Sequence, residues 1–140
     1  MAVRFDRPLE VRLPASVDAV PTARHRVSRW LAQAKTDRVV NDELALVVTE
    51  LVTNAVEASP GPDATIEIHG HFDRGPSVVL QVSDHGRGFS LGHSPELPAV
   101  RAVRGRGLPI VDALTDHLVV ERQGETTVVE ITRNLGDTDR

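Results

Sequence analysis

The segment VVTELVTNAVEAS carries two polar residues, Glu50 and Asn54, four positions apart. In a helix this spacing places both side chains on the same side, one turn from each other. An amide oxygen suits Mg²⁺, which prefers hard oxygen ligands, and a carboxylate one turn earlier can accept a hydroxyl proton. The pair therefore indicates either a site for phosphoryl chemistry or the solvated polar stripe of an amphipathic helix.

In a second stretch, VSDHGRGF, Asp84 lies at the end of a predicted apolar strand. Gly86 and Gly88 then allow tight backbone turns. A carboxylate that accepts a hydrogen bond from an exocyclic amine selects adenine over guanine, because guanine presents a carbonyl there. The alternative interpretation is an ordinary Asp-x-Gly turn between a strand and a loop.

The third stretch, GRGLPIV, has Gly105 and Gly107 immediately before a predicted short helix. Glycines let the backbone approach an anion, and the free N–H groups at the start of a helix favour phosphate. Arg104 lies beside this stretch, and an arginine fork suits phosphate oxygens, although it is equally at home on a solvated surface. Together the three stretches predict a nucleotide site.

Two long helices must position the first stretch, and apolar residues recurring at spacings of three and four predict both. The first helix covers about residues 20–34 and closes over 35–37. The second begins at a cap provided by Asn41 or Asp42 and ends by Pro60. Its wide apolar face predicts packing against a sheet.

Strands are predicted where apolar and polar residues alternate or where β-branched residues cluster between turn residues. They cover residues 9–13, 65–72, 78–82, 117–121 and 127–131. The second and third strands form one hairpin, and the fourth and fifth form another. A long loop over about 88–105 is typical of a lid, and a short helix over 108–114 follows it. The pattern predicts helices on one face of a mostly antiparallel sheet.

The composition limits the classes of protein to which the chain can belong. The chain has 140 residues, 40% of them hydrophobic, which predicts a single domain over 1–135 with a polar tail over 136–140. It has no cysteine, so disulfides and thiolate metal sites are excluded. A formal net charge of −4 and few aromatic residues argue against direct nucleic-acid binding. No apolar run approaches about 20 residues, so we expect an untargeted cytoplasmic protein without a membrane segment.

In their order along the chain, TELVTNAVEAS, SDHGRGF and GRGLPIV resemble the N, G1 and G2 boxes of the Bergerat-fold ATPases, which include histidine kinases and type II topoisomerases. Within that superfamily the compact length and the ELVTNAV string most resemble the bacterial anti-sigma factor serine/threonine kinases. The resemblance covers nearly the whole chain. It implies an α/β two-layer sandwich, with helices on one face of a mixed, mainly antiparallel sheet.

The resemblance also implies roles for particular residues. Glu50 would be the general base, Asn54 the Mg²⁺ ligand and Asp84 the adenine contact. Thr126, in ETTVV, matches the threonine on the family's closing strand that assists this aspartate. The residues lining the bound nucleotide would be Gly86, Gly88, Arg104, Gly105, Gly107 and Leu108.

The function implied by the resemblance is phosphorylation of a small antagonist protein, with ATP and Mg²⁺, by a homodimer that also binds a sigma factor. Arg24 and Arg26 on the first helix are candidate partner contacts, or else residues of a solvated helix face. The chain departs from the family at Glu57 and Ala58, where a basic or polar residue and then histidine are frequent. The added carboxylate either supports metal binding, repels phosphate or points into solvent.

Two other functions are compatible with the same boxes. One is a regulatory binding module that holds ATP or ADP only to shape a protein-binding surface. The other is the catalytic part of a histidine kinase, which is disfavoured because about 40 residues before the second helix are too short, at ~1.5 Å rise per residue, for a long phosphoacceptor hairpin.

Overall fold

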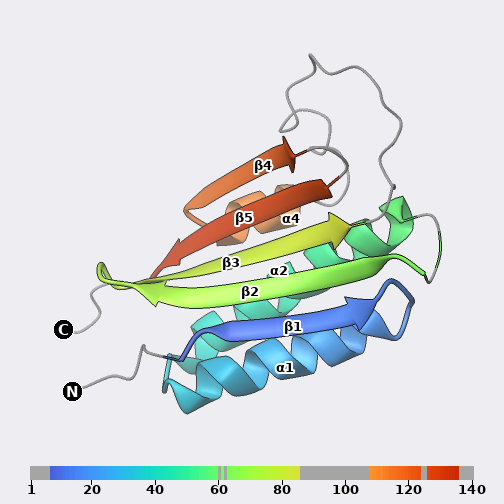
Figure 1. The fold of residues 1–140 in the computed structure, drawn as a ribbon. Helices are drawn as coiled ribbons and strands as arrows, with labels where there is room; N and C mark the ends of the chain where they lie inside the picture. The colour runs from blue at the N-terminus through green and yellow to red at the C-terminus, as the bar shows by residue number, and fades with distance from the viewer. Residues whose placement is uncertain (1–6, 60, 62, 86–107, 124–125, 136–140) are drawn as a thin grey trace.

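The computed structural model describes residues 7–59, 61, 63–85, 108–123 and 126–135. Within these ranges, three helices cover one face of a five-stranded sheet, so the fold is a two-layer α/β sandwich (Figure 1). The elements are β1 (Leu9–Pro14), α1 (Ala19–Gln33), α2 (Arg38–Ala58), β2 (Thr65–Asp73), β3 (Ser77–His85), α4 (Leu108–Leu114), β4 (His117–Gln123) and β5 (Thr126–Asn134). The predicted loop over 88–105 and the polar tail over 136–140 lie outside the described residues.

The sheet has the strand order β1-β2-β3-β5-β4, and each neighbouring pair is antiparallel. Both predicted hairpins, β2 with β3 and β4 with β5, are confirmed. β1 lies at an edge, where the missing N–H of Pro14 costs no ladder hydrogen bond. The predicted fold class is confirmed, and the mixed sheet implied by the resemblance is antiparallel throughout the described strands.

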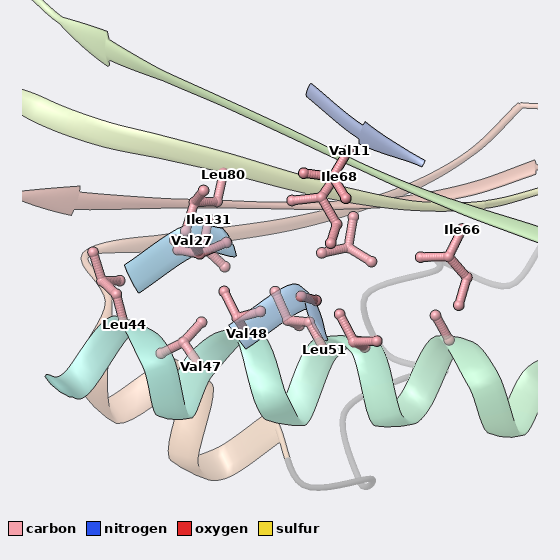
Figure 2. Packing of buried hydrophobic residues seen from close by; sticks show 14 of the residues in the cluster. Val11, Val27, Leu44, Val47, Val48, Leu51, Ile66, Ile68, Leu80 and Ile131 are labelled. Carbon is pink, nitrogen blue, oxygen red and sulfur yellow. The ribbon is translucent and has the colours of Figure 1, made fainter. Parts of the chain in front are cut away.

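The core lies between the sheet and α2 (Figure 2). Alternation along β3 turns every second side chain toward the helices, and these side chains are apolar over most of the strand. They pack against the buried face of α2, whose residues recur at spacings of three and four. The fully buried set includes Leu44, Val47, Val48, Ile66, Ile68, Leu80 and Ile131.

The junction between α1 and α2 fixes the position of the site helix. Lys35 has φ 62°, in the left-handed region, and ends α1. The Thr36 N–H donates to the Leu31 carbonyl at 3.2 Å, and the Lys35 N–H donates to the Ala32 carbonyl at 2.9 Å. These two bonds form a Schellman motif, which satisfies the last carbonyls of the helix.

The start of α2 differs from the prediction. The sequence pattern favoured Asn41 or Asp42 as its cap, but the helix begins one turn earlier, at Arg38. Asp37 is the cap, because its carboxylate accepts a hydrogen bond from the Val39 N–H at 3.1 Å. Asn41 instead pairs its side-chain oxygen with the Thr36 hydroxyl. Several residues of similar capping strength compete here, and the packed position of the end of α1 determines which of them caps α2.

The contact between α1 and β2 depends on one glycine. A Cβ at Gly70 would lie 2.9 Å from side-chain atoms of both Leu80 and Trp30. The Trp30 ring also stacks against Phe72, with ring centroids 4.8 Å apart, and its indole N–H donates to the Arg7 carbonyl at 2.9 Å. Gly70 therefore makes room for the indole ring against the sheet. No helix in the described part of the chain is both long and apolar enough to cross a bilayer.

Candidate functional site

The chain brings the end of α2 and the end of β3 to the same edge of the sandwich (Figure 1). α2 ends at Ala58, and after a short connection β2 begins at Thr65. In the β2–β3 ladder Ile66 lies opposite Asp84. Because the connection is short, Asn54, in the last turns of α2, is kept at the Asp84 end of the sheet.

Asp84 is the polar end of an otherwise apolar row. Val78, Leu80 and Val82 face the helices, and alternation places Asp84 on this same face, where it is only 4% exposed. A carboxylate at this depth is stable only with polar partners, because desolvation of an unpaired charge is expensive. The structure thus places the predicted adenine contact in a buried position at the end of β3.

The threonine next to Asp84 is Thr127 rather than Thr126. In the β3–β5 ladder Thr127 lies directly opposite Asp84, so both side chains are on the helix-covered face. Thr126 lies opposite His85 and lines a cavity on the other face of the sheet. The assignment of Thr126 is therefore corrected by one residue: a slip of one position in a strand moves a side chain to the opposite face.

Two buried polar atoms at this end of the molecule are available to a ligand. The Asn54 amide nitrogen and the Thr127 hydroxyl are buried and have no hydrogen-bond partner among the described residues. Buried polar groups are nearly always hydrogen-bonded, because leaving one unsatisfied costs about 1–3 kcal/mol. Two such groups, one of them opposite the buried Asp84, are typical of a polar ligand site.

Glu50 and Asn54 lie one turn apart on α2, as predicted, and both are half-buried. Glu57 is exposed among the described residues. The departure from the family at this position therefore places a carboxylate on the exposed side of the last turns of α2.

An ion pair ties α2 to the far ends of α4 and β5. The Arg133 guanidinium lies 2.8 Å from the Glu43 carboxylate and also donates to the Leu114 carbonyl at 3.0 Å. The second bond satisfies an orphan carbonyl at the end of α4, where a positive charge also complements the helix dipole. Arg133 thus holds two helices in a fixed relation.

The remaining predicted residues divide into three groups. Leu108 is 1% exposed and anchors the first turn of α4 in the core, so its backbone rather than its side chain is the part suited to contact a nucleotide. Arg24 and Arg26 are exposed on α1. The predicted residues that lie outside the described ranges are Gly86, Gly88, Arg104, Gly105 and Gly107.

The chemistry of the described groups fits an adenine nucleotide. The Asp84 carboxylate suits an exocyclic amine, and a neighbouring hydroxyl can donate to a ring nitrogen or accept from the same amine. The Asn54 amide offers an oxygen for a hard cation and a nitrogen for a phosphate oxygen. Asp84 and Thr127 lie opposite each other in the β3–β5 ladder, and Asn54 lies in the last turns of α2.

A model of a known protein family matches most of the chain. The family model of the histidine kinase-like ATPase domain matches residues 13–133. The chain therefore belongs to the histidine kinase-like ATPase domain family, and membership of that family implies ATP binding. The predicted Bergerat-fold resemblance is confirmed.

A solved structure shares the fold. The crystal structure of the RsbU and RsbW domains of Rv1364c from Mycobacterium tuberculosis is similar to the chain with a TM-score of 0.71 and 23% sequence identity. The match covers 95% of this chain and 34% of that one, so the chain spans about a third of the length of that protein. The likeness shows a shared fold.

Proposed function

We propose that the protein is an ATP- and Mg²⁺-dependent serine/threonine protein kinase that acts as an anti-sigma factor. The observation that carries the proposal is the pairing of Glu50 with Asn54, one turn apart on the helix that ends beside Asp84. Family membership accounts for ATP binding, and Glu50 is the residue that distinguishes a kinase from a passive ATP-binding protein.

In this proposal each residue has a separate task. Asp84 and Thr127 hold the adenine, which fixes the nucleotide at the β3–β5 end of the site. The Asn54 side-chain oxygen would hold Mg²⁺, which neutralises phosphate charge when it is bound. Glu50 accepts the proton of the attacking serine or threonine hydroxyl, since a carboxylate within hydrogen-bond reach serves as a general base.

The substrate and partners follow from the likeness to an RsbW domain. We propose a small antagonist protein as the phosphoryl acceptor and a sigma factor as the second partner. Arg24 and Arg26 on the exposed side of α1 are the proposed partner contacts, and a homodimer is the proposed assembly. We also keep as proposals a single domain over residues 1–135, a cytoplasmic location and the lining of the nucleotide by the glycines and Arg104 of the two boxes.

The test compares two carboxylates on one helix. Glu50→Gln is expected to lower phosphorylation of a candidate antagonist by about 10²–10⁴-fold, the usual contribution of a positioned base, while ATP affinity is retained. Glu57→Gln is the matched control, because Glu57 is exposed on the same helix, and its activity should stay near that of the unchanged protein. Calorimetry measures ATP binding, and radiolabelled phosphate transfer measures activity.

The outcome separates the proposed kinase from a regulatory module. If Glu50→Gln phosphorylates the antagonist as fast as the unchanged protein, Glu50 is not the base. If the unchanged protein binds ATP and its partner but never transfers phosphate to any candidate antagonist, the nucleotide serves only to shape the binding surface. If ATP with Mg²⁺ does not bind at all, the whole nucleotide site is wrong.

A further inference from the structure

The strand β4 forms one edge of the sheet, and within the described residues no strand lies beyond it (Figure 1). Every second residue of an edge strand points its backbone N–H and C=O away from the sheet, so such an edge can pair with another strand. Proteins often block an edge with proline or lysine. At the other edge β1 ends in Pro14, whereas β4, with the sequence HLVVERQ, contains neither residue type. The β4 edge is therefore the better suited to strand pairing.

The middle of β4 is apolar on both faces. Leu118 and Val120 turn toward the helices, and Val120 is only 6% exposed. Val119 turns to the opposite face, where it is 43% exposed. A strand partner would bury this valine and pair its backbone. A single exposed valine is common on protein surfaces, so the residues beside it decide whether β4 fits a partner.

His117 and Glu121 flank Val119 on the same face of β4, two positions to either side, and both are exposed. The imidazole has an N–H donor in both of its protonation states, and a carboxylate accepts. Within one strand the two side chains are about 13 Å apart, at about 3.3 Å per residue, so they cannot meet. A second β4 that runs antiparallel, with Val119 opposite its own copy, places each His117 opposite the other chain's Glu121. Glu121 also interacts within its own chain, and a carboxylate has lone pairs for a further donor.

The same register matches the helix-covered face, and the neighbouring registers do not match. Centred on Val119, the pairing puts Leu118 opposite Val120, so apolar side chains meet. Centring on Val120 would instead put Val119 opposite Glu121. Centring on Leu118 would put His117 opposite Val119. A parallel alignment would place Glu121 beside its own copy, and like charges side by side are destabilising.

We propose that β4 pairs with β4 of a second copy of the chain, antiparallel and centred on Val119. The two five-stranded sheets then join into one, with the helices of both copies on the same face. The same patch serves both copies, as in any twofold interface. This inference names the interface of the homodimer proposed above and rests on that assembly, but it does not rest on kinase activity. Antiparallel pairing turns the Asp84 ends of the two sheets in opposite directions, so each candidate nucleotide site stays within one copy.

Single cysteines can test the interface, because the chain has no cysteine of its own. Val119→Cys should form an intermolecular disulfide under mild oxidation. Residues directly opposite in an antiparallel pair have Cα atoms about 4.5–5.5 Å apart, which is within disulfide reach. Because the pair is preformed, the disulfide should form at least about 10-fold faster than in Val39→Cys, where the substituted residue is 59% exposed on α2. Equal rates at equal concentration overturn the proposal.

Two further cysteine variants test the register. His117→Cys alone and Glu121→Cys alone should crosslink slowly, because neither position lies opposite its own copy. A mixture of the two variants should crosslink rapidly and give the mixed dimer, which mass spectrometry identifies. If each variant crosslinks with itself as fast as with the other, the register centred on Val119 is wrong.

Sedimentation equilibrium measures the assembly without a crosslink. Val119→Lys places two ammonium groups opposite each other and removes the apolar contact, so it should weaken dimerisation at least about 10-fold. Val39→Lys is the matched control, because it adds the same charge at an exposed valine on α2, and it should leave dimerisation unchanged. Both variants should keep the ATP affinity of the unchanged protein, which shows that they are folded.

Failure of the interface can be distinguished from failure of the proposed function. A dimer that persists in Val119→Lys, with no rapid crosslink in Val119→Cys, contradicts the β4 interface and leaves the homodimer standing. A chain that is monomeric at every concentration contradicts both the interface and the homodimer. Neither result bears on phosphoryl transfer, which Glu50→Gln tests separately.

Discussion

The assignment of Thr127 rather than Thr126 makes a prediction in which stability and affinity change in opposite directions. Thr→Val keeps the shape of the side chain and replaces its hydroxyl by a methyl group. The Thr127 hydroxyl is buried and has no partner among the described residues, so the protein without nucleotide bears the cost of its desolvation. Thr127→Val should therefore stabilise the nucleotide-free protein by about 1–2 kcal/mol, part of the 1–3 kcal/mol cost of an unsatisfied buried group.

The same change should weaken nucleotide binding. If the Thr127 hydroxyl forms one hydrogen bond to the adenine or to the group that contacts it, its loss costs about 0.5–1.5 kcal/mol, or about 2- to 13-fold in affinity. Without nucleotide, a gain of 1 kcal/mol should raise Tm by about 3–5 °C for a domain of this size. Saturating ATP should stabilise the variant less than it stabilises the unchanged protein.

Thr126→Val is the matched control, because its side chain lies on the other face of the sheet. It should change ATP affinity by less than about 2-fold, within the range typical of substitutions away from a site. Thermal unfolding and calorimetry with ATP measure both quantities on the same samples. The reasoning is refuted if Thr126→Val weakens ATP binding while Thr127→Val lowers stability and leaves affinity unchanged.

Three further predictions concern the scaffold that positions the site. Gly70→Ala should destabilise the protein by about 1–3 kcal/mol in urea unfolding, because its Cβ would overlap Trp30 and Leu80; a native-like midpoint would contradict the packing. Lys35→Gly should stabilise it by about 0.5–1 kcal/mol by relieving a left-handed conformation, and an unchanged or lower Tm would argue against that conformation. A double-mutant cycle of Arg133→Met and Glu43→Gln should give a coupling free energy of about 1 kcal/mol, and additive effects would mean that the ion pair contributes nothing to stability.

Much of the fold could be predicted because its signals are local. Apolar spacing identified both long helices and all five strands, and the turn residues identified both hairpins. The boundary of α2 was less certain, because Asp37, Asn41 and Asp42 are all good capping residues. Only the packed position of the α1 terminus, with its Schellman motif, selected Asp37.

The sequence predicted some features of the candidate site and could not predict others. Glu50 and Asn54 follow from helical spacing, and Asp84 follows from the end of an apolar strand, so the sequence alone makes all three candidates. The Asn54 amide nitrogen and the Thr127 hydroxyl lack a hydrogen-bond partner among the described residues. This can be seen only when the surrounding groups are known, and no sequence pattern supplies them. Two neighbouring threonines, Thr126 and Thr127 in ETTVV, must lie on opposite faces of a strand. The sequence does not show which of them faces the helices.

By itself, the sequence determined the family, the order of the elements and the residue types available for nucleotide chemistry. Tertiary structure decided on which face of the sheet each strand residue lies. The physical reason is that a strand alternates with a period of two, so the register between β3 and β5 must be known before Thr127 can be paired with Asp84 and Thr126 with His85. That register separates the candidate nucleotide site from the cavity on the opposite face.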